Sequence, residues 1–247
     1  MHVFPEAQPA PSLRDCTEDD VRRLVDHVEP DLIIHTAAIS DIGACERDPE
    51  ASWRANVALP LLLVSTGVRT LLFSSDQVYG GSPAEGPYTE EEAAPVHIYA
   101  RHKLEMEQRA LALNPSTVIL RATWMYDLPV YGLTNRGNYL MNMLTRREMR
   151  FSFSQQRAVT YMRDVALRTR EAVRLPGGVY NFGSENPLSM LSLSTWLKEE
   201  LFLSVSFSDA GPIHHLWMNC AKAASFGIRF PTSQEGLHEC ISDYGLK

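Results

Sequence analysis

The stretch LLFSSDQVYGG, residues 71–81, has the pattern that fixes the predicted fold. An apolar run, Leu71 to Phe73, ends in two serines and an aspartate, and turn-forming residues follow. A short apolar run without alternation is typical of a parallel strand buried on both faces. In such sheets ligands bind beyond the carboxyl ends of the strands. We therefore expect Ser74, Ser75 and Asp76 at the edge of a binding crevice.

The same pattern repeats on both sides of this stretch. Apolar runs at residues 32–38 and 116–121 alternate with helical patterns at 15–28, 49–65 and 95–113. This alternation predicts an α/β fold with a doubly wound parallel sheet. The strand ends would bring Ala37, Ala38 and the segment from Ala122 to Trp124 around the crevice that Ser75 faces.

Beyond Trp124 the pattern is less regular. Short strand-like pieces at 150–153, 178–182 and 204–207 are mixed with helical patterns at 137–145, 163–173, 192–201 and 232–244. We expect a larger α/β domain at residues 1–135 and a smaller mixed lobe at residues 136–247. The lobe would pack over the crevice, and the two parts would form one intertwined structural unit.

The composition excludes several classes of protein. The 247 residues carry a net charge of −7 and no basic run, which argues against a nucleic-acid partner. The longest apolar runs are far too short for a membrane span, and the first residues lack the features of a signal peptide. The four scattered cysteines predict free thiols in a reducing cytoplasm, with neither disulfides nor a metal site.

Tyr99 and Lys103 lie four residues apart and therefore on one face of a helix. An ammonium beside a tyrosine favours the phenolate, so we expect Lys103 to lower the pKa of Tyr99 toward the working range. A serine hydroxyl at a nearby strand end, Ser75, could polarise a substrate carbonyl. The Tyr–Lys spacing alone is weak, but its position after a strand-end Ser-Ser makes carbonyl–alcohol redox chemistry a specific hypothesis.

Two further features have competing interpretations. Arg157 and Arg163 could bind a substrate diphosphate through bidentate hydrogen bonds, or they could be ordinary surface arginines. His214 and His215 have no carboxylate or cysteine at ligand spacing, so a loop or strand pair is favoured over a metal site.

The chain resembles the extended short-chain dehydrogenases/reductases and, within them, the dTDP-4-dehydrorhamnose reductase family. The matching motifs are residues 30–38, 56–57, 73–79, 87–90, 99–107, 120–126, 160–166 and 178–182. The resemblance covers the chain from about Asp15 to the C-terminus. It implies a Rossmann-like cofactor domain followed by a substrate-binding lobe.

By this resemblance Tyr99 would be the general acid, Lys103 would also hold the nicotinamide ribose, and Ser75 would polarise the ketone. Asn56 would support the active-site helix. The remaining implied positions are cofactor contacts at Asp15, Ala37, Ala38, Ser74 and Ala122, and substrate contacts at Asp76, Trp124 and, as argued above, Arg157.

The implied activity is NADPH- or NADH-dependent reduction of a keto group on a nucleotide-activated deoxysugar, by a cytoplasmic protein that could form a homodimer. A sugar-nucleotide epimerase remains an alternative within the enzyme class. A non-catalytic regulatory subunit, like the β subunit of methionine adenosyltransferase, is the alternative from another class.

The sequence departs from the family pattern in two ways. Ala100 and His102 replace the usual glycine and the usual serine or threonine beside Tyr99. More seriously, no glycine-rich turn for the cofactor pyrophosphate precedes Asp15, since the first glycine is Gly43. About 30 residues of a βαβ unit are therefore expected to be missing. Either the protein no longer binds cofactor, or the sequence omits segments after residue 3 and near residues 64–65.

Overall fold

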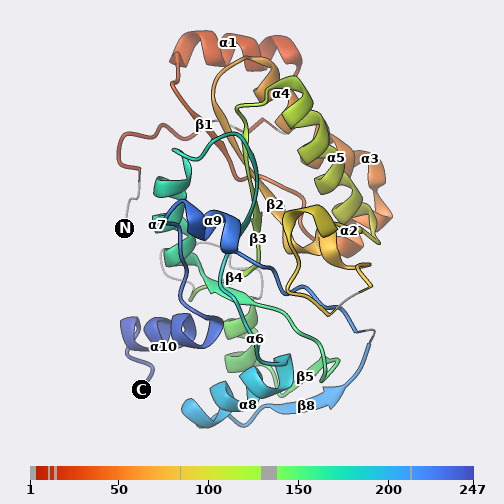
Figure 1. Cartoon of the computed structure of the whole chain (residues 1–247), viewed down its shortest axis with the longest axis vertical. Helices are drawn as coiled ribbons and strands as arrows, with labels where there is room; N and C mark the ends of the chain where they lie inside the picture. The colour runs from red at the N-terminus through yellow and green to blue at the C-terminus, as the bar shows by residue number, and fades with distance from the viewer. Residues whose placement is uncertain (1–3, 11, 14–15, 84, 129–137, 212) are drawn as a thin grey trace.

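The computed structural model describes residues 4–10, 12–13, 16–83, 85–128, 138–211 and 213–247 (Figure 1). Its centre is a parallel sheet with the order β1 (Ile33–His35), β2 (Thr70–Ser75), β3 (Val118–Ala122) and β7 (Gly178–Phe182). The predicted α/β class with a doubly wound parallel sheet is confirmed. The register aligns Ser75 with Ala122, and Ala122 with Phe182, so three strands end at one level.

Both faces of the sheet are buried, which explains why its strands are apolar without alternation. Leu72 and Ile119 pack on one face against helices α4 (Leu59–Ser65) and α5 (Ile98–Leu113). Leu71, Val118 and Leu120 face the other way, toward helix α7 (Met162–Ala172) and the segment around α9 (Ala221–Ser225). Successive residues of a strand point to opposite faces, so both halves of each run find an apolar neighbour.

The helices of the first face lie side by side (Figure 1). They are α2 (Ile42–Arg47), α3 (Pro49–Trp53), the π-helical turn η1 (Arg54–Ala58), α4 (Leu59–Ser65) and α5 (Ile98–Leu113). The segments α3, η1 and α4 form the helix predicted at residues 49–65. Pro60 lacks the N–H that would continue the regular ladder, and the wider π turn precedes it.

Helix α1 (Glu18–Val28) packs against α4. Thr17 is its N-cap and forms a reciprocal capping box with Asp20.

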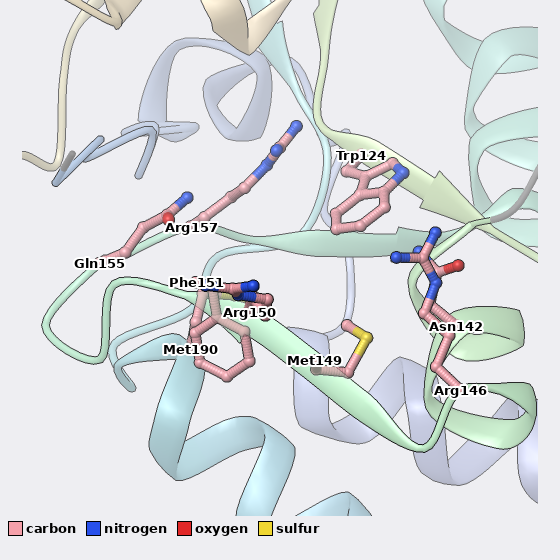
Figure 2. A pocket seen from close by; sticks show the side chains of 9 residues that line it. All are labelled: Trp124, Asn142, Arg146, Met149, Arg150, Phe151, Gln155, Arg157 and Met190. Carbon is pink, nitrogen blue, oxygen red and sulfur yellow. The ribbon is translucent and has the colours of Figure 1, made fainter. Parts of the chain in front are cut away.

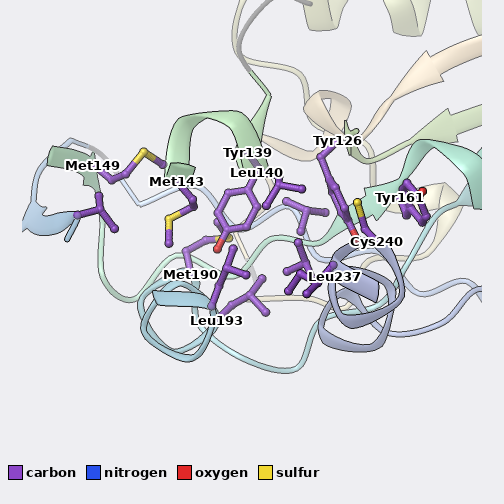
Figure 3. Close-up of a cluster of buried hydrophobic side chains, with 14 residues drawn as sticks. Tyr126, Tyr139, Leu140, Met143, Met149, Tyr161, Met190, Leu193, Leu237 and Cys240 are labelled. Carbon is purple, nitrogen blue, oxygen red and sulfur yellow. The ribbon is translucent and has the colours of Figure 1, made fainter. Parts of the chain in front are cut away.

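Two small parallel sheets and three helices make up most of the second half of the chain. The sheets pair β4 (Trp124–Tyr126) with β6 (Val159–Tyr161), and β5 (Glu148–Phe151) with β8 (Ser206–Asp209). Helices α6 (Tyr139–Thr145), α8 (Met190–Glu200) and α10 (Ser233–Asp243) surround a separate core (Figure 3). Tyr126, Tyr139 and Leu193 are fully buried in it.

One strand differs from the sequence expectation. Residues 178–182 were expected in the smaller lobe, yet β7 pairs with β3 in the central sheet. Helix α7 (Met162–Ala172) and α9 (Ala221–Ser225) also pack on the sheet. Gly177 allows this docking, because a Cβ there would lie 1.8 Å from the carbonyl oxygen of Pro115. Within the described residues, no helix combines the length and hydropathy needed to cross a membrane.

Candidate active site

Ser75 ends β2 and begins the short 3₁₀ helix η2 (Asp76–Tyr79). Its hydroxyl accepts a hydrogen bond from the Gln77 amide at 3.2 Å and donates to the Asp76 carboxylate at 3.2 Å. Ser75 also lowers the pKa of Tyr99, so the two side chains lie near each other. A strand end and a helix start thus bring together two hydroxyls that the sequence separates by more than twenty residues.

Lys103 lies one turn after Tyr99 on α5, and its side chain is buried. Its ammonium donates to the Phe73 carbonyl at 2.8 Å and lies 5.9 Å from the centre of the Tyr99 ring. Phe73 precedes the two serines of β2. Lys103 therefore links helix α5 to the strand that carries Ser75, and the three residues predicted to be catalytic lie close together.

The protonation of these groups differs from the sequence expectation. Burial raises the pKa of Tyr99 to about 12, although its hydrogen bond with Ser75 and the charge of Arg157 oppose the rise. The cost of burying a phenolate is the largest influence on this pKa, so the fall predicted from the Tyr–Lys spacing does not occur. Burial also lowers the pKa of Lys103 to about 8, while Glu107 opposes the fall. Tyr99 therefore keeps its proton at neutral pH.

Glu107 continues the face of α5 that carries Tyr99 and Lys103, and it is 1% exposed. It accepts a hydrogen bond from Ser74 at 2.5 Å and pairs with Arg121 of β3 at 2.6 Å. Burying either charge alone would be costly, so the pair fixes the position of α5 on the sheet. The helix face is thereby anchored one turn from Lys103 and one residue from Ser75.

Arg121 extends this network across the sheet. Its guanidinium donates to the Tyr79 hydroxyl and to the Glu90 carbonyl, both at 2.7 Å. Tyr79 in turn donates to Asn181 of β7 at 2.7 Å. Every member is therefore hydrogen-bonded, as a buried polar network requires. Desolvation raises the pKa of Tyr79 despite the neighbouring guanidinium, so its hydroxyl remains a donor.

A second set of contacts links α5 to the helix at residues 49–65. The Asn56 side chain bonds both backbone groups of Ile39 and donates to Ser52 at 3.2 Å. Ser52 and His102 Nδ1 are 2.9 Å apart. The unusual His102 thus has a partner on the neighbouring helix, and Ala100 is fully buried at the other departure from the family pattern.

Asp76 links Ser75 to an arginine that lines a cavity. It is 1% exposed, and its carboxylate lies 3.3 Å from the Arg157 guanidinium. Burial raises the pKa of Asp76, and Arg157 opposes the rise. Arg157 also lies over the Trp124 ring, 5.0 Å from its centre. Arg157 therefore links the end of β2 to Trp124.

The cavity has a volume of about 230 Å³ and lies between β4, β5, α6 and α8 (Figure 2). Three arginines, Arg146, Arg150 and Arg157, contribute to its lining. The other lining residues are Trp124, Asn142, Met149, Phe151, Gln155 and Met190. An aromatic ring, amides and three guanidinium groups suit a polar anionic ligand with a flat or sugar-like part.

The residues predicted to contact the cofactor differ in exposure and in hydrogen bonding. Ala37 and Ala38 are exposed beyond the end of β1, and Ala122 is buried level with Ser75. The Ser74 hydroxyl donates its hydrogen to Glu107, so this hydrogen is not available to a cofactor. Asp15 lies outside the described residues.

The residues around Tyr99 fit the ribose of a nicotinamide cofactor. Lys103 uses one N–H for Phe73 and has two others for a ribose hydroxyl. The first turn of α1 carries Glu18, Asp19 and Asp20, and Thr17 already caps it, so this helix start does not suit an anionic ligand.

Sequence reasoning missed Arg121, Arg146, Arg150 and the role of Glu107. A charged residue inside a buried strand, such as Arg121, signals a buried partner, and Glu107 continues the helix face of Lys103. Nothing in the sequence distinguishes Arg150 from other surface arginines. Arg163 does not line the cavity, since it pairs with Asp243 of α10. Among the described residues, no cluster of His, Cys, Asp and Glu could hold a metal ion.

Comparison with known proteins identifies the family to which this chain belongs. The family model of the RmlD substrate-binding domain matches residues 9–205. The chain belongs to this family. Bacillus subtilis SpsK, a spore coat polysaccharide biosynthesis protein, is 26% identical over 202 residues, which are 77% of this chain and 70% of SpsK. The dTDP-4-dehydrorhamnose reductase of Mycolicibacterium smegmatis is 33% identical over 114 residues, 44% of this chain and only 34% of that protein.

Solved structures share the fold of this RmlD-family chain. A dTDP-4-dehydrorhamnose reductase from Clostridium acetobutylicum superposes with a TM-score of 0.80 at 20% identity, covering 98% of this chain and 92% of the other. The UDP-glucose 4-epimerase of Thermotoga maritima, solved with UDP-glucose, has a TM-score of 0.80 at 18% identity, with coverages of 95% and 83%. At these identities the likeness establishes the fold.

Proposed function

We propose that this chain carries the catalytic half of a nicotinamide-dependent reductase that acts on a keto group of a nucleotide-activated deoxysugar. One observation carries the proposal. The side chains of Ser75 and Tyr99 lie beside Lys103, and Asp76 pairs with Arg157, one of three arginines that line a neighbouring cavity. Family membership and the reductase named among the relatives support this assignment.

In the proposed reaction Ser75 donates a hydrogen bond to the substrate carbonyl oxygen and stabilises negative charge on it. Tyr99 holds its proton at neutral pH because burial raises its pKa, so it acts as the general acid that protonates this oxygen. The hydride for the carbonyl carbon comes from the nicotinamide cofactor, NADPH or NADH, when it is bound. Lys103 is mostly cationic near pH 7, and its free N–H groups suit a ribose hydroxyl.

The arginines of the cavity favour a nucleoside-diphosphate sugar over a neutral ketone. Arg146 and Arg150 are exposed, and neither has an ion pair within the described part of the chain. Their charges are therefore available for a diphosphate, while Trp124 offers a flat surface to the sugar. We also propose that the lobe at residues 136–247 binds the substrate, with β7 and α7 excepted. Cytoplasmic location and a homodimer remain predictions.

Two other functions remain alternatives. The likeness to the Thermotoga maritima epimerase keeps an epimerase of the same chemistry as the alternative enzyme. A non-catalytic binding subunit of the same fold is the second alternative. The second alternative requires that the chain bind no nicotinamide cofactor.

The test is a titration of the full gene product with NADPH and NADH, followed by fluorescence quenching, and then an assay with a dTDP-4-keto-6-deoxysugar. Saturable binding at micromolar concentrations with turnover that Tyr99→Phe abolishes would support the reductase. Binding of the nucleotide sugar without binding of either cofactor would overturn it and support the binding subunit. Interconversion of sugar epimers without net cofactor oxidation would support the epimerase.

A further inference from the structure

His97 lies two residues before Tyr99 and contacts three parts of the proposed site. It is the N-cap of α5, where its Nδ1 atom accepts the Ala100 amide hydrogen at 3.2 Å. Its Nε2 atom lies 3.1 Å from Oε1 of Gln77, two residues after Ser75. Its ring stacks on the Tyr99 ring, with centroids 6.2 Å apart and planes 11° apart. One imidazole therefore joins the Ser75 loop, the helix start and the tyrosine.

These contacts define the protonation state of the imidazole. A backbone N–H can only donate, so Nδ1 must be an unprotonated acceptor. The Gln77 carbonyl oxygen can only accept, so Nε2 must carry the proton. The neutral Nε2–H tautomer satisfies both contacts. A second proton on Nδ1 would point at the Ala100 amide and remove the cap, and it would place a positive charge at the positive end of the helix dipole.

We propose that neutral His97 is a positioning residue for Tyr99, and that protonation of its Nδ1 atom releases the helix start and uncouples Tyr99 from the Ser75 loop. This inference rests on the function proposed above, because it assigns the role through Tyr99. The imidazole touches no reacting atom. It acts by fixing the distance between the two hydroxyls that bind the carbonyl oxygen.

The surroundings of His97 favour the neutral form. The groups that face it are Gln77 of η2, Glu46 of α2, His214 after β8, and Arg101 and Tyr99 of α5. Burial lowers the pKa of His97 most, His214 and Arg101 lower it further, and Glu46 opposes them. Glu46 also accepts the Ile98 amide hydrogen at 2.8 Å, so the helix start has a second, independent contact.

Because this pKa is below its ordinary value, the unfolded chain takes up the proton first as the pH falls. The stability that neutral His97 provides is therefore lost progressively from about pH 6.5 down to the folded pKa. Loss of the cap occurs over the lower part of this range. If His97 positions Tyr99, the geometry of Tyr99 should change as His97 is protonated. If His97 only caps the helix, it should not.

The first experiment needs neither cofactor nor substrate. The wild-type chain, His97→Asn and the control His238→Asn, an exposed histidine on α10, are titrated by NMR from pH 8 to pH 5. We expect the imidazole signal that is lost in His97→Asn to titrate below the ordinary pKa of about 6.5. The Ala100 amide exchange rate and the Tyr99 ring shifts should follow the same midpoint in the wild-type and the control. Asparagine can cap but cannot be protonated, so both changes should disappear in His97→Asn.

The second experiment measures kcat between pH 5 and pH 8. At pH 7.5 we expect His97→Asn to stay within about twofold of the wild-type and His97→Ala to lose roughly tenfold, because a displaced acid reacts more slowly. The wild-type and His238→Asn should show an acid decline that His97→Asn lacks.

Each failure has a distinct signature. Absence of turnover in every variant, with the NMR coupling intact, would refute the proposed activity but leave the coupling of His97 to Tyr99 established. Tyr99 ring shifts that ignore the His97 titration, or identical pH profiles for wild-type and His97→Asn, would overturn the positioning role.

Discussion

Arg121, beneath the catalytic helix, and Arg150, at the cavity, carry the same charge in different surroundings. Arg121 is 2% exposed and contacts Glu107, Tyr79 and the Glu90 carbonyl. Arg150 is exposed, and no ion pair of its side chain is found among the described residues. A buried charge needs partners that hold it in one geometry, whereas an exposed charge is available to a ligand. The buried network around Arg121 holds helix α5 in place on the sheet, whereas the cavity at Arg150 is suited to binding a ligand.

The largest expected effect is a loss of turnover, and it tests the role proposed for Tyr99 on helix α5. Tyr99→Phe should lower kcat by about 10²–10⁴-fold, because it removes the proton donor. Phenylalanine keeps the ring and its stacking on His97, so the melting temperature should change little. Tyr139→Phe is the matched control, since this tyrosine is buried and bonds Ser194 away from the site. Equal turnover by the two variants in a stopped-flow NADPH assay would remove Tyr99 from the mechanism.

The next effect tests whether the network under α5 depends on burial. Glu107→Ala leaves the Arg121 guanidinium buried without its carboxylate and should lower the free energy of unfolding by about 3–5 kcal/mol. Glu105→Ala, two residues away, breaks the exposed pair with Arg109 and the hydrogen bond from the Trp53 indole, and should cost about 1–2 kcal/mol. Urea unfolding followed by circular dichroism measures both. A loss of similar size in both variants would mean that the position of Glu107 has no special stabilising role.

A smaller effect tests the binding region. Arg150→Ala should raise KM for the nucleotide sugar about tenfold with little change in kcat, because a charge-assisted hydrogen bond to the diphosphate is lost. Arg147→Ala is the control, since this neighbouring arginine does not line the cavity. The effect of Arg150→Ala should shrink at high salt. If KM is the same for both variants at low salt, the diphosphate does not bind at Arg150.

The pH dependence of Lys103 is expected to have opposite signs in measurements of activity and of stability. With a pKa of about 8 in the folded chain, Lys103 loses its charge above that pH, so kcat/KM should decline through pH 8. Between pH 8 and about 10.5 the unfolded chain binds the extra proton, so this group's contribution to stability rises with pH. Subtracting the unfolding free energy of Lys103→Met from that of the wild-type isolates the rise. A flat difference across this range would show that the pKa of Lys103 is not lowered.

Much of the catalytic region could be predicted from local sequence. The apolar run before Ser74 and Ser75 predicted a buried strand, and the four-residue spacing of Tyr99 and Lys103 predicted a shared helix face. The Thr17 capping box was also predictable, because capping depends on residues three apart. Strand, helix face and cap depend on neighbours in the chain, and this is why the sequence was informative about them.

The binding region and the protonation states could not be predicted in this way. The cavity is lined by Arg146, Arg150 and Arg157, which come from segments whose sequences look like any protein surface. Strand β7 was expected in the smaller lobe but pairs with β3 in the central sheet. The pKa of Tyr99 rose where the Tyr–Lys spacing predicted a fall, because desolvation depends on everything that packs around the ring.

The sequence by itself therefore determined the parallel sheet, the strand end at Ser75 and the helix face of Tyr99 and Lys103, because each follows from the period and chemistry of nearby residues. Only the tertiary structure decided which charges are buried in pairs, which arginines remain exposed, and that His97 joins the Ser75 loop to Tyr99. Burial and long-range contact are properties of the packed chain, and they set both pKa values and the geometry of the proposed site.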